Sequence, residues 1–295
     1  MTQKISSAAS GFRPIIARRL PPKASTALPR FGEACFLAPP ACIRPARKRE
    51  KALPEAVELS VVVPVKDEAG NVAPLAREIA AALKHEAAYE IVFVDDGSTD
   101  ATAAELIALK PELPLRVLGH AHNLGQSRAI RTGVRAAKGV IVVTLDGDGQ
   151  NDPADIPKLL SLFRESAANP HLGMVAGERA KRQDVWRKRA ASRLGNAIRR
   201  TLLNDTAKDT GCGLKVFRRE AFLALPYFDH MHRYLITLML REGYEVRFIP
   251  VNHRPRGTGR SKYGVLDRLA VGFSDLAGVI WLKRRHRGHD TPKEY

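Results

Sequence analysis

The stretch GVIVVTLDGDGQNDP, residues 139–153, decides how the surrounding chain is interpreted. Its β-branched run of strand length breaks into Asp146 and Asp148, which are separated by one glycine, and Gln150 follows two positions later. A continuous apolar run of this length predicts a strand buried on both faces, as in a parallel sheet. Carboxylates without a counterion are costly at the end of a buried strand. The stretch therefore predicts a strand whose acidic end needs compensation.

Strands and helices are predicted to alternate before this stretch. Three more apolar runs have strand length: ELSVVVPV (58–65), YEIVFVDD (89–96) and LRVLGH (115–120). Apolar residues at helical spacing fill the intervals NVAPLAREIAAALKH (71–85), ATAAELIALK (101–110) and QSRAIRTGVRAAK (126–138). This alternation predicts an α/β fold with a doubly wound, mainly parallel sheet that carries helices on both faces.

Acidic motifs follow three of the predicted strands, namely PVKDE (64–68), DDGSTD (95–100) and DGDGQ (146–150). Ligands of doubly wound sheets bind beyond the carboxyl ends of the strands, so we expect the three motifs along one rim, where they need a cation. Hard oxygen ligands favour Mg²⁺ or Mn²⁺ shared with substrate phosphates. We expect Asp146, Asp148 and Gln150 to be its ligands, although a DGD sequence alone more often marks a turn.

The residues around the acidic positions have expected roles of their own. Gly147 is expected to let the backbone approach a ligand closely. Asp152, before Pro153, is expected to cap the next helix rather than to join the site. In DDGSTD, Asp96 is expected to accept from a base or ribose hydroxyl, with a helix cap at Ser98 or Thr99 as the ordinary alternative.

Charge is distributed unevenly along the 295 residues. The chain carries a net charge of +17, and residues 1–49 hold ten Lys and Arg but one acid. Such charge favours a phosphate-bearing partner without identifying it. The few aromatic residues argue against a nucleic-acid stacking platform, and we expect no nucleic-acid partner. Three cysteines, Cys35, Cys42 and Cys212, lack metal-site spacing, and no disulfide is expected.

Composition also sets the expected domain boundaries. Residues 1–56 are predicted to be a disordered basic extension, with a transit peptide or an over-long start as alternatives. A catalytic domain is predicted over 57–250, a basic substrate loop and an amphipathic helix over 251–288, and a tail over 289–295.

The apolar run near the carboxyl end, 269–282, is too short to cross a bilayer. Its amphipathic pattern and its basic flank KRRHR predict a helix that lies on a membrane surface, at the cytoplasmic face and without a transmembrane span. Packing on the core, or on a second subunit in a homo-oligomer, is an equal alternative. The basic amphipathic stretch 185–204 is expected either to line the acceptor entrance or to be a solvated helix.

From Glu58 to Arg287 the chain resembles family 2 glycosyltransferases of the GT-A fold, in the branch of dolichol-phosphate mannose synthase and bacterial polyprenyl-phosphate glycosyltransferases. The motifs that carry the resemblance are, in order, ELSVVVPVKDE, IVFVDDGSTD, HNLGQSRAIRTG, VVTLDGDGQNDP, DTGCGLKVFRRE and VNHRPRGTGRSKYG. Two departures are Lys66 and Asp67, which stand where the family often has aromatic and Asn residues, and these put the base contact in doubt.

The resemblance implies a set of site residues. It assigns the nucleotide base and ribose to Pro64, Glu68, Val94 and Asp96. It assigns the metal and diphosphate to Asp146, Gly147, Asp148 and Gln150, and further phosphate contacts to Arg179, Arg256, Ser261 and Lys262. The residues expected to carry catalysis are Asp148, Asp209, Arg256 and Lys262.

The implied function is an inverting, Mg²⁺- or Mn²⁺-dependent transfer of a sugar from a GDP- or UDP-sugar to a polyprenyl phosphate. An acceptor phosphate is itself nucleophilic, so Asp209 is expected to position groups rather than to act as a strong base, with a structural role equally weighted. The alternatives are a saccharide acceptor, which would need Asp209 or another acid as base, and a basic nucleic-acid-binding protein. A nucleotidylyltransferase is disfavoured because the first strand lacks a Gly-rich, Lys-containing phosphate loop.

Overall fold

The computed structural model describes residues 57–86, 88–166, 169–179, 203, 209–255 and 265–288. Strands and helices alternate over its first half: β1 (Leu59–Val65), α1 (Val72–Ala82), β2 (Tyr89–Asp95), α2 (Thr102–Ala108), β3 (Leu115–Gly119), α3 (Gln126–Ala136) and β4 (Ile141–Thr144). The second half contains η1 (Pro153–Asp155), α4 (Ile156–Glu165), β5 (Leu172–Arg179), β6 (Lys215–Arg218), α6 (Arg219–Ala224), η2 (Met231–Tyr234), α7 (Leu235–Arg241), β7 (Glu245–Val251) and α8 (Val265–Arg285).

The strands form one sheet in the order β3-β2-β1-β4-β6-β5-β7. Neighbouring strands are parallel except that β6 runs antiparallel to both β4 and β5. The predicted fold class, an α/β sheet that is mainly parallel, is therefore confirmed. The reversed β6 was not anticipated from the sequence.

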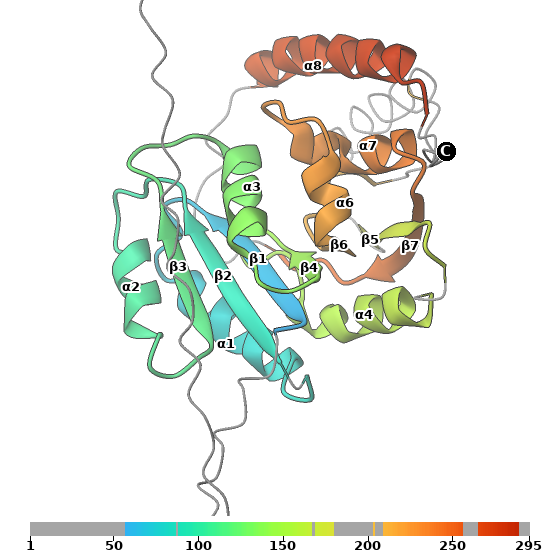
Figure 1. The fold of residues 1–295 in the computed structure, drawn as a ribbon. Coiled ribbons are helices and arrows are strands. Elements are labelled where there is room, and N and C mark those ends of the chain that lie inside the picture. The colour runs from blue at the N-terminus through green and yellow to red at the C-terminus, as the bar shows by residue number, and fades with distance from the viewer. Residues whose placement is uncertain are drawn as a thin grey trace, which may run out of the picture. The chain divides into compact units, whose positions relative to one another are not determined.

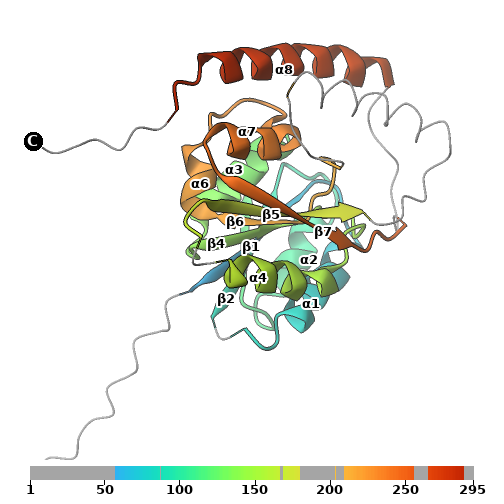
Figure 2. The same ribbon diagram turned by 90° about the vertical axis from the view of Figure 1, so that its right-hand side faces the viewer.

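Helices cover both faces of the sheet (Figure 2), as predicted. Buried residues of α1 and α4 pack with β1 and β2 side chains such as Phe93 in one apolar core. Residues of α3, α6 and α7 pack with Val62 and Val94 in the other. Gly133 lets α3 approach closely, since a Cβ there would lie under 3.0 Å from the Val62 side chain. Both cores hold β1, β2 and β4 rigidly, which fixes the edge where these strands end (Figure 1).

The long helix α8 is attached to the second core. Leu276, Val279, Ile280 and Leu282 pack against that core, and Val279 is fully buried. Arg241 Nε donates to the Leu282 carbonyl oxygen at 3.1 Å. Packing on the core, one of the two sequence-based alternatives, thus applies to this part of α8, whereas its contact with a membrane stays a prediction. Within the described residues, every helix is too short or too polar to cross a bilayer.

Several predictions fall outside the described residues. These are the disordered extension over 1–56, the stretch 185–204 apart from Leu203, and the roles of Arg256, Ser261 and Lys262. Of the cysteines, the structure describes Cys212, which is a free and buried thiol.

Candidate active site

The acidic motifs lie at the carboxyl ends of three adjacent strands. β1 pairs in parallel with β2 on one side and with β4 on the other. The loops that follow these strands therefore share one edge of the sheet, as the sequence predicted. Pro64 is tolerated in the central strand β1 because β4 ends its pairing at Val62, before it reaches the proline.

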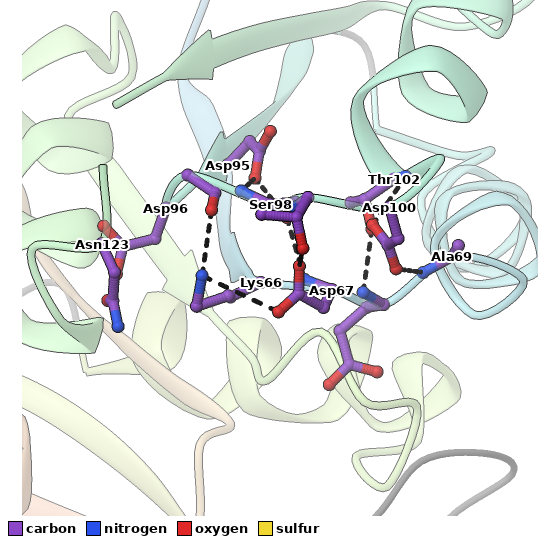
Figure 3. Close-up of polar contacts among 12 residues, drawn as sticks. Lys66, Asp67, Ala69, Asp95, Asp96, Ser98, Asp100, Thr102 and Asn123 are labelled. Carbon is purple, nitrogen blue, oxygen red and sulfur yellow. Dashed lines mark hydrogen bonds and ion pairs between the residues drawn. The ribbon is translucent and has the colours of Figure 1, made fainter. Parts of the chain in front are cut away.

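The loop after β1 is joined to the loop after β2 and to the first turn of α2 by four consecutive backbone amides. Figure 3 shows the side chains of Ser98, Asp100 and Thr102 that face this loop. The N–H groups of residues 67, 68, 69 and 70 donate in turn to side-chain oxygens of Ser98, Thr102, Asp100 and Glu105, at 2.8, 2.8, 3.1 and 2.9 Å. We call these four contacts the amide ladder. Because each donor has a side-chain acceptor, the ladder fixes the two loops against each other.

Acids of the second motif organise the backbone. Asp95 accepts from the Ser98 N–H at 2.9 Å, and Asp100 accepts from the Thr102 N–H at 3.0 Å at the start of α2. The N-cap position of α2 is Ala101, so neither Ser98 nor Thr99 caps this helix, and Asp100 is the acid that accepts from its first N–H. Gly97 has a φ of +70° and a Cβ there would lie 2.7 Å from the backbone of His122, so the turn requires glycine.

Asp96 is buried and holds the loop before α3. Its oxygens accept from the Leu124 and Gly125 N–H groups, both at 2.8 Å. His120 Nδ1 lies 2.8 Å from Asp96, and His120 Nε2 lies 3.0 Å from the Thr132 hydroxyl. The carboxylate predicted to contact a base or ribose is thus also the anchor of residues 120–125.

These contacts give the acids after β1 and β2 hydrogen-bond donors from the protein itself, whereas the expected cation at this edge stays a prediction. Asp67 accepts from the Thr99 N–H at 2.8 Å, and Asp95, Asp96 and Asp100 also accept backbone donors. Hydrogen bonds from amides stabilise these charges locally. The motif after β4 is where a counterion is needed most.

Asp146 and Asp148 follow β4 directly and influence each other. Gln126 Nε2, at the start of α3, donates to Asp146 at 2.8 Å. Burial and then the charge of Asp148 raise the pKa of Asp146 to about 6, against the opposing effects of Lys215, Gln126 and Arg179. Asp148 accepts from the Gln150 N–H at 3.2 Å. Two carboxylates are therefore held together in a setting that favours a bound cation.

Glycines shape the surroundings of Asp146. A Cβ on Gly147 would lie 2.9 Å from the Pro64 carbonyl oxygen, so this glycine permits contact between β1 and the β4 exit. Its close approach to a ligand stays a prediction. A Cβ on Gly213 would lie under 3.0 Å from the Asp146 carboxylate. Buried Asn151 accepts from the Asp146 N–H at 3.0 Å. The predicted cap is confirmed, since Asp152 accepts from the Ala154 N–H at 3.0 Å.

Arg179 and Asp209 form a bidentate ion pair. Nε and Nη2 of Arg179 donate to the two Asp209 oxygens at 2.6 and 2.7 Å, and their side chains are 14% and 10% exposed. Lys215, at the start of β6, is 5% exposed and donates to the Cys212 carbonyl oxygen. Burial lowers the pKa of Lys215, and Cys212, Asp146 and Asp209 oppose that effect. Cationic groups thus stand close to Asp146.

Other predicted residues are placed as follows. Pro64 pairs with Val94 in the sheet, and the Val94 side chain is fully buried near Gly133. Any substrate contact of Val94 would therefore involve its backbone. Glu68 Oε2 accepts from the Asn71 side chain at 2.7 Å. Lys66 Nζ donates to the Gly97 carbonyl oxygen at 2.9 Å, which places a cation between β1 and β2 (Figure 3).

The donor set after β4 fits Mg²⁺ or Mn²⁺. Two carboxylates and an amide oxygen are the hard ligands these ions prefer. In the described part of the chain, no group of three or more His, Cys, Asp or Glu could hold a metal. The protein thus offers a partial ligand set, which suits an ion shared with phosphate oxygens. Gln126, Asn151, Gly213 and Lys215 support this site and were missed by sequence reasoning.

Comparison with known sequences decides the family. Residues 60–225 match glycosyl transferase family 2. The chain belongs to this family. The resemblance and the expected enzyme class, a glycosyltransferase, are therefore confirmed.

This glycosyltransferase is similar to sugar transferases and synthases whose names include a polyprenyl phosphate. It is 32% identical over 236 residues to dodecaprenyl-phosphate galacturonate synthase of Rhizobium johnstonii, which covers 78% of this chain and 68% of the relative. It is 36% identical over 218 residues to undecaprenyl-phosphate 4-deoxy-4-formamido-L-arabinose transferase of Edwardsiella ictaluri. That match covers 73% of this chain and 66% of the relative. The chain thus spans about two thirds of the length of these relatives.

Solved structures support the fold. Glucosyl-3-phosphoglycerate synthase from Mycobacterium tuberculosis, in complex with Mn²⁺, UDP-glucose and phosphoglyceric acid, matches this glycosyltransferase with a TM-score of 0.57. The sequence identity is 20%, and the match covers 77% of this chain and 79% of that protein. The likeness establishes the shared GT-A fold, and no more.

Proposed function

We propose that this glycosyltransferase moves a sugar from a nucleoside diphosphate to the phosphate of a polyprenyl phosphate, with inversion at the sugar carbon and with Mg²⁺ or Mn²⁺. The main support is the pair Asp146 and Asp148 at the exit of β4, flanked by the cations of Lys215 and Arg179. The names of the relatives favour the acceptor class. The identity of the sugar and of the base, GDP or UDP, is left to experiment.

The donor end of the reaction needs positive charge. Asp146, Asp148 and Gln150 would hold the ion, which supplies a Lewis acid for the departing diphosphate. Arg179 is oriented by Asp209 in a fixed fork geometry that suits phosphate oxygens. Pro64, Glu68, Val94 and Asp96 would surround the base and ribose. Arg256, Ser261 and Lys262 are proposed to complete the phosphate contacts from the following loop.

The acceptor end needs no strong base if the nucleophile is a phosphate oxygen. Both oxygens of Asp209 accept from Arg179, which disfavours proton abstraction by this carboxylate. A saccharide hydroxyl acceptor would require such a base. The ion pair therefore favours the phosphate acceptor and assigns Asp209 a positioning role.

Access to a lipid acceptor implies contact with a membrane. We propose peripheral attachment at the cytoplasmic face through α8. Trp281 is 58% exposed, and Lys283, Arg284 and Arg285 occupy the last turn of that helix. Exposed tryptophan beside basic residues suits an anionic headgroup layer.

Product analysis tests the proposal. Purified protein is incubated with a panel of GDP- and UDP-sugars, Mn²⁺, and either a short-chain polyprenyl phosphate or saccharides. We expect a glycosylated polyprenyl phosphate, identified by mass, and no product after EDTA treatment. Product on saccharides alone would reject the acceptor. Nucleic-acid binding with no transfer from any donor would favour the basic binding-protein alternative.

Replacing Asp209 by asparagine separates positioning from base catalysis. We expect kcat to fall roughly 10- to 100-fold, because Arg179 loses its bidentate partner, with the shape of the pH–rate profile unchanged. The matched control is Glu178→Gln, next to Arg179 on β5, with activity expected within about twofold of wild type. If Asp209→Asn instead removes the acidic limb of the profile, Asp209 is the general base.

A further inference from the structure

One side of α3 carries a row of arginines. Arg128, Arg131 and Arg135 follow one another at intervals of three and four residues, so they lie along one side of the helix. The sheet-facing side is formed by buried residues such as Ala129 and Val134. The row begins two residues after Gln126, which contacts Asp146, and leads away from the metal motif.

Tyr227, in the connection between α6 and η2, forms a platform for two of these arginines. The Cζ atoms of Arg128 and Arg131 lie 4.3 and 5.0 Å from the centroid of its ring. The Tyr227 hydroxyl donates to Asp229 at 3.2 Å. Cation–π contacts with one ring hold both guanidinium groups close together despite their like charge.

One donor atom of the half-buried Arg131 lacks a hydrogen-bond partner in the described part of the chain. Its Nη1 atom is buried and has no hydrogen-bond partner among the residues that the structure describes. A buried donor without an acceptor is costly, and its position in a charged cluster points to a missing anion. Burial, followed by the charges of Arg135 and Arg128, lowers the pKa of Arg131, which fits a cluster with excess positive charge.

We propose that Arg128, Arg131 and Tyr227 form a second phosphate site, distinct from the metal motif at Asp146, for the phosphate group of a lipid. Guanidinium forks bind phosphate oxygens in bidentate fashion, and stacking on a ring pre-orients them. A lipid is favoured over a soluble anion because the loop that holds Tyr227 also reaches α8. His230 Nδ1 in that loop lies 3.1 Å from Asp275 Oδ2 of α8.

Two lipids present this chemistry: an anionic phospholipid and the acceptor of the proposed function. Only the second source depends on that function. The full chain is therefore tested in two binding experiments that need no transfer activity. One is co-sedimentation with vesicles of phosphatidylglycerol and phosphatidylcholine, and the other is calorimetric titration with a short-chain polyprenyl phosphate.

The test variants are Arg131→Gln and Arg128→Gln. The matched control is Arg77→Gln, because Arg77 is an exposed arginine on a different helix, α1. We expect at least one of the two affinities to fall about tenfold in the test variants and neither to change in the control. Loss of vesicle binding identifies a phospholipid headgroup. Loss of polyprenyl-phosphate binding identifies the acceptor.

Thermal unfolding of each variant shows whether a loss of binding is caused by a loss of folding. Removing an uncompensated charge in Arg131→Gln is expected to raise the unfolding midpoint by about 1–3 °C. A lower midpoint would identify Arg131 as a structural residue and overturn the proposal. Unchanged affinity for both lipids, or an equal loss in Arg77→Gln, would also overturn it. Calorimetric binding of Mn²⁺ with UDP or GDP should be unaffected, which separates this site from the donor site.

Discussion

Asp148→Asn is expected to lower kcat by about 10²–10³-fold while the unfolding midpoint stays close to that of wild type. The amide oxygen of asparagine can still accept from the Gln150 N–H, so the local turn is kept. The negative charge is lost, and with it one of two carboxylates available to a divalent ion. Isothermal titration with Mn²⁺ and a nucleoside diphosphate should show weaker metal binding in parallel with the kinetic loss.

The matched control for this substitution is Asp152→Asn in the same loop. Asp152 accepts from the Ala154 N–H as a helix cap and from Arg254 Nη2 at 2.6 Å. We expect activity within about threefold of wild type and a loss of roughly 1 kcal/mol in the free energy of unfolding. Full activity in Asp148→Asn, or an equal kinetic loss in Asp152→Asn, would refute the assignment of Asp148 to the metal.

Gly213→Ala should reduce activity about 10²-fold, because the added methyl group displaces the carboxylate of Asp146 while Asp146 itself is unchanged. A methyl group at this position would lie under 3.0 Å from both Asp146 carboxylate oxygens, so Asp146 must move. The overpacking is expected to cost about 1–3 kcal/mol of folding free energy. Steady-state kinetics over a range of Mn²⁺ concentrations would report the displacement as a weaker dependence on the metal.

Gly119→Ala provides the contrast for that prediction. Gly119 ends β3, has no atom within 4 Å of a built Cβ and no left-handed φ. In Gly119→Ala the free energy of unfolding should change by less than about 1 kcal/mol, and the activity should be unaltered. Normal activity in a folded Gly213→Ala protein would show that the position of Asp146 is not critical.

The sequence was most informative about buried elements. The runs that form β1, β2 and β4 are apolar at consecutive positions. Over 59–65 and 89–95 the apolar residues do not follow helical spacing, so a strand was the favoured prediction. The placement of the acidic motifs at one edge followed from the parallel direction of the strands, because each motif comes directly after a strand. The antiparallel β6 was missed because a strand of four residues, Lys215–Arg218, carries too little periodicity.

The fate of individual acids was harder to predict. Whether Asp67 or Asp96 meets a ligand or a backbone amide depends on how separate loops pack, and local sequence does not encode that packing. Lys215 is the residue that a closer reading could have found. A lysine in the apolar segment GLKVF is costly to bury without a partner. In the structure burial lowers the pKa of Lys215, and Cys212 and then Asp146 oppose that effect.

The amide ladder constrains where a nucleotide can place its charged groups. In many nucleotide-binding sheets the first turn after the first strand presents unoccupied N–H groups to a pyrophosphate. Here the equivalent amides of residues 67–70 are already saturated by side-chain oxygens. We therefore expect a donor to lie with its heterocycle over that turn and its anionic end displaced across the sheet, above the neighbouring strand β4.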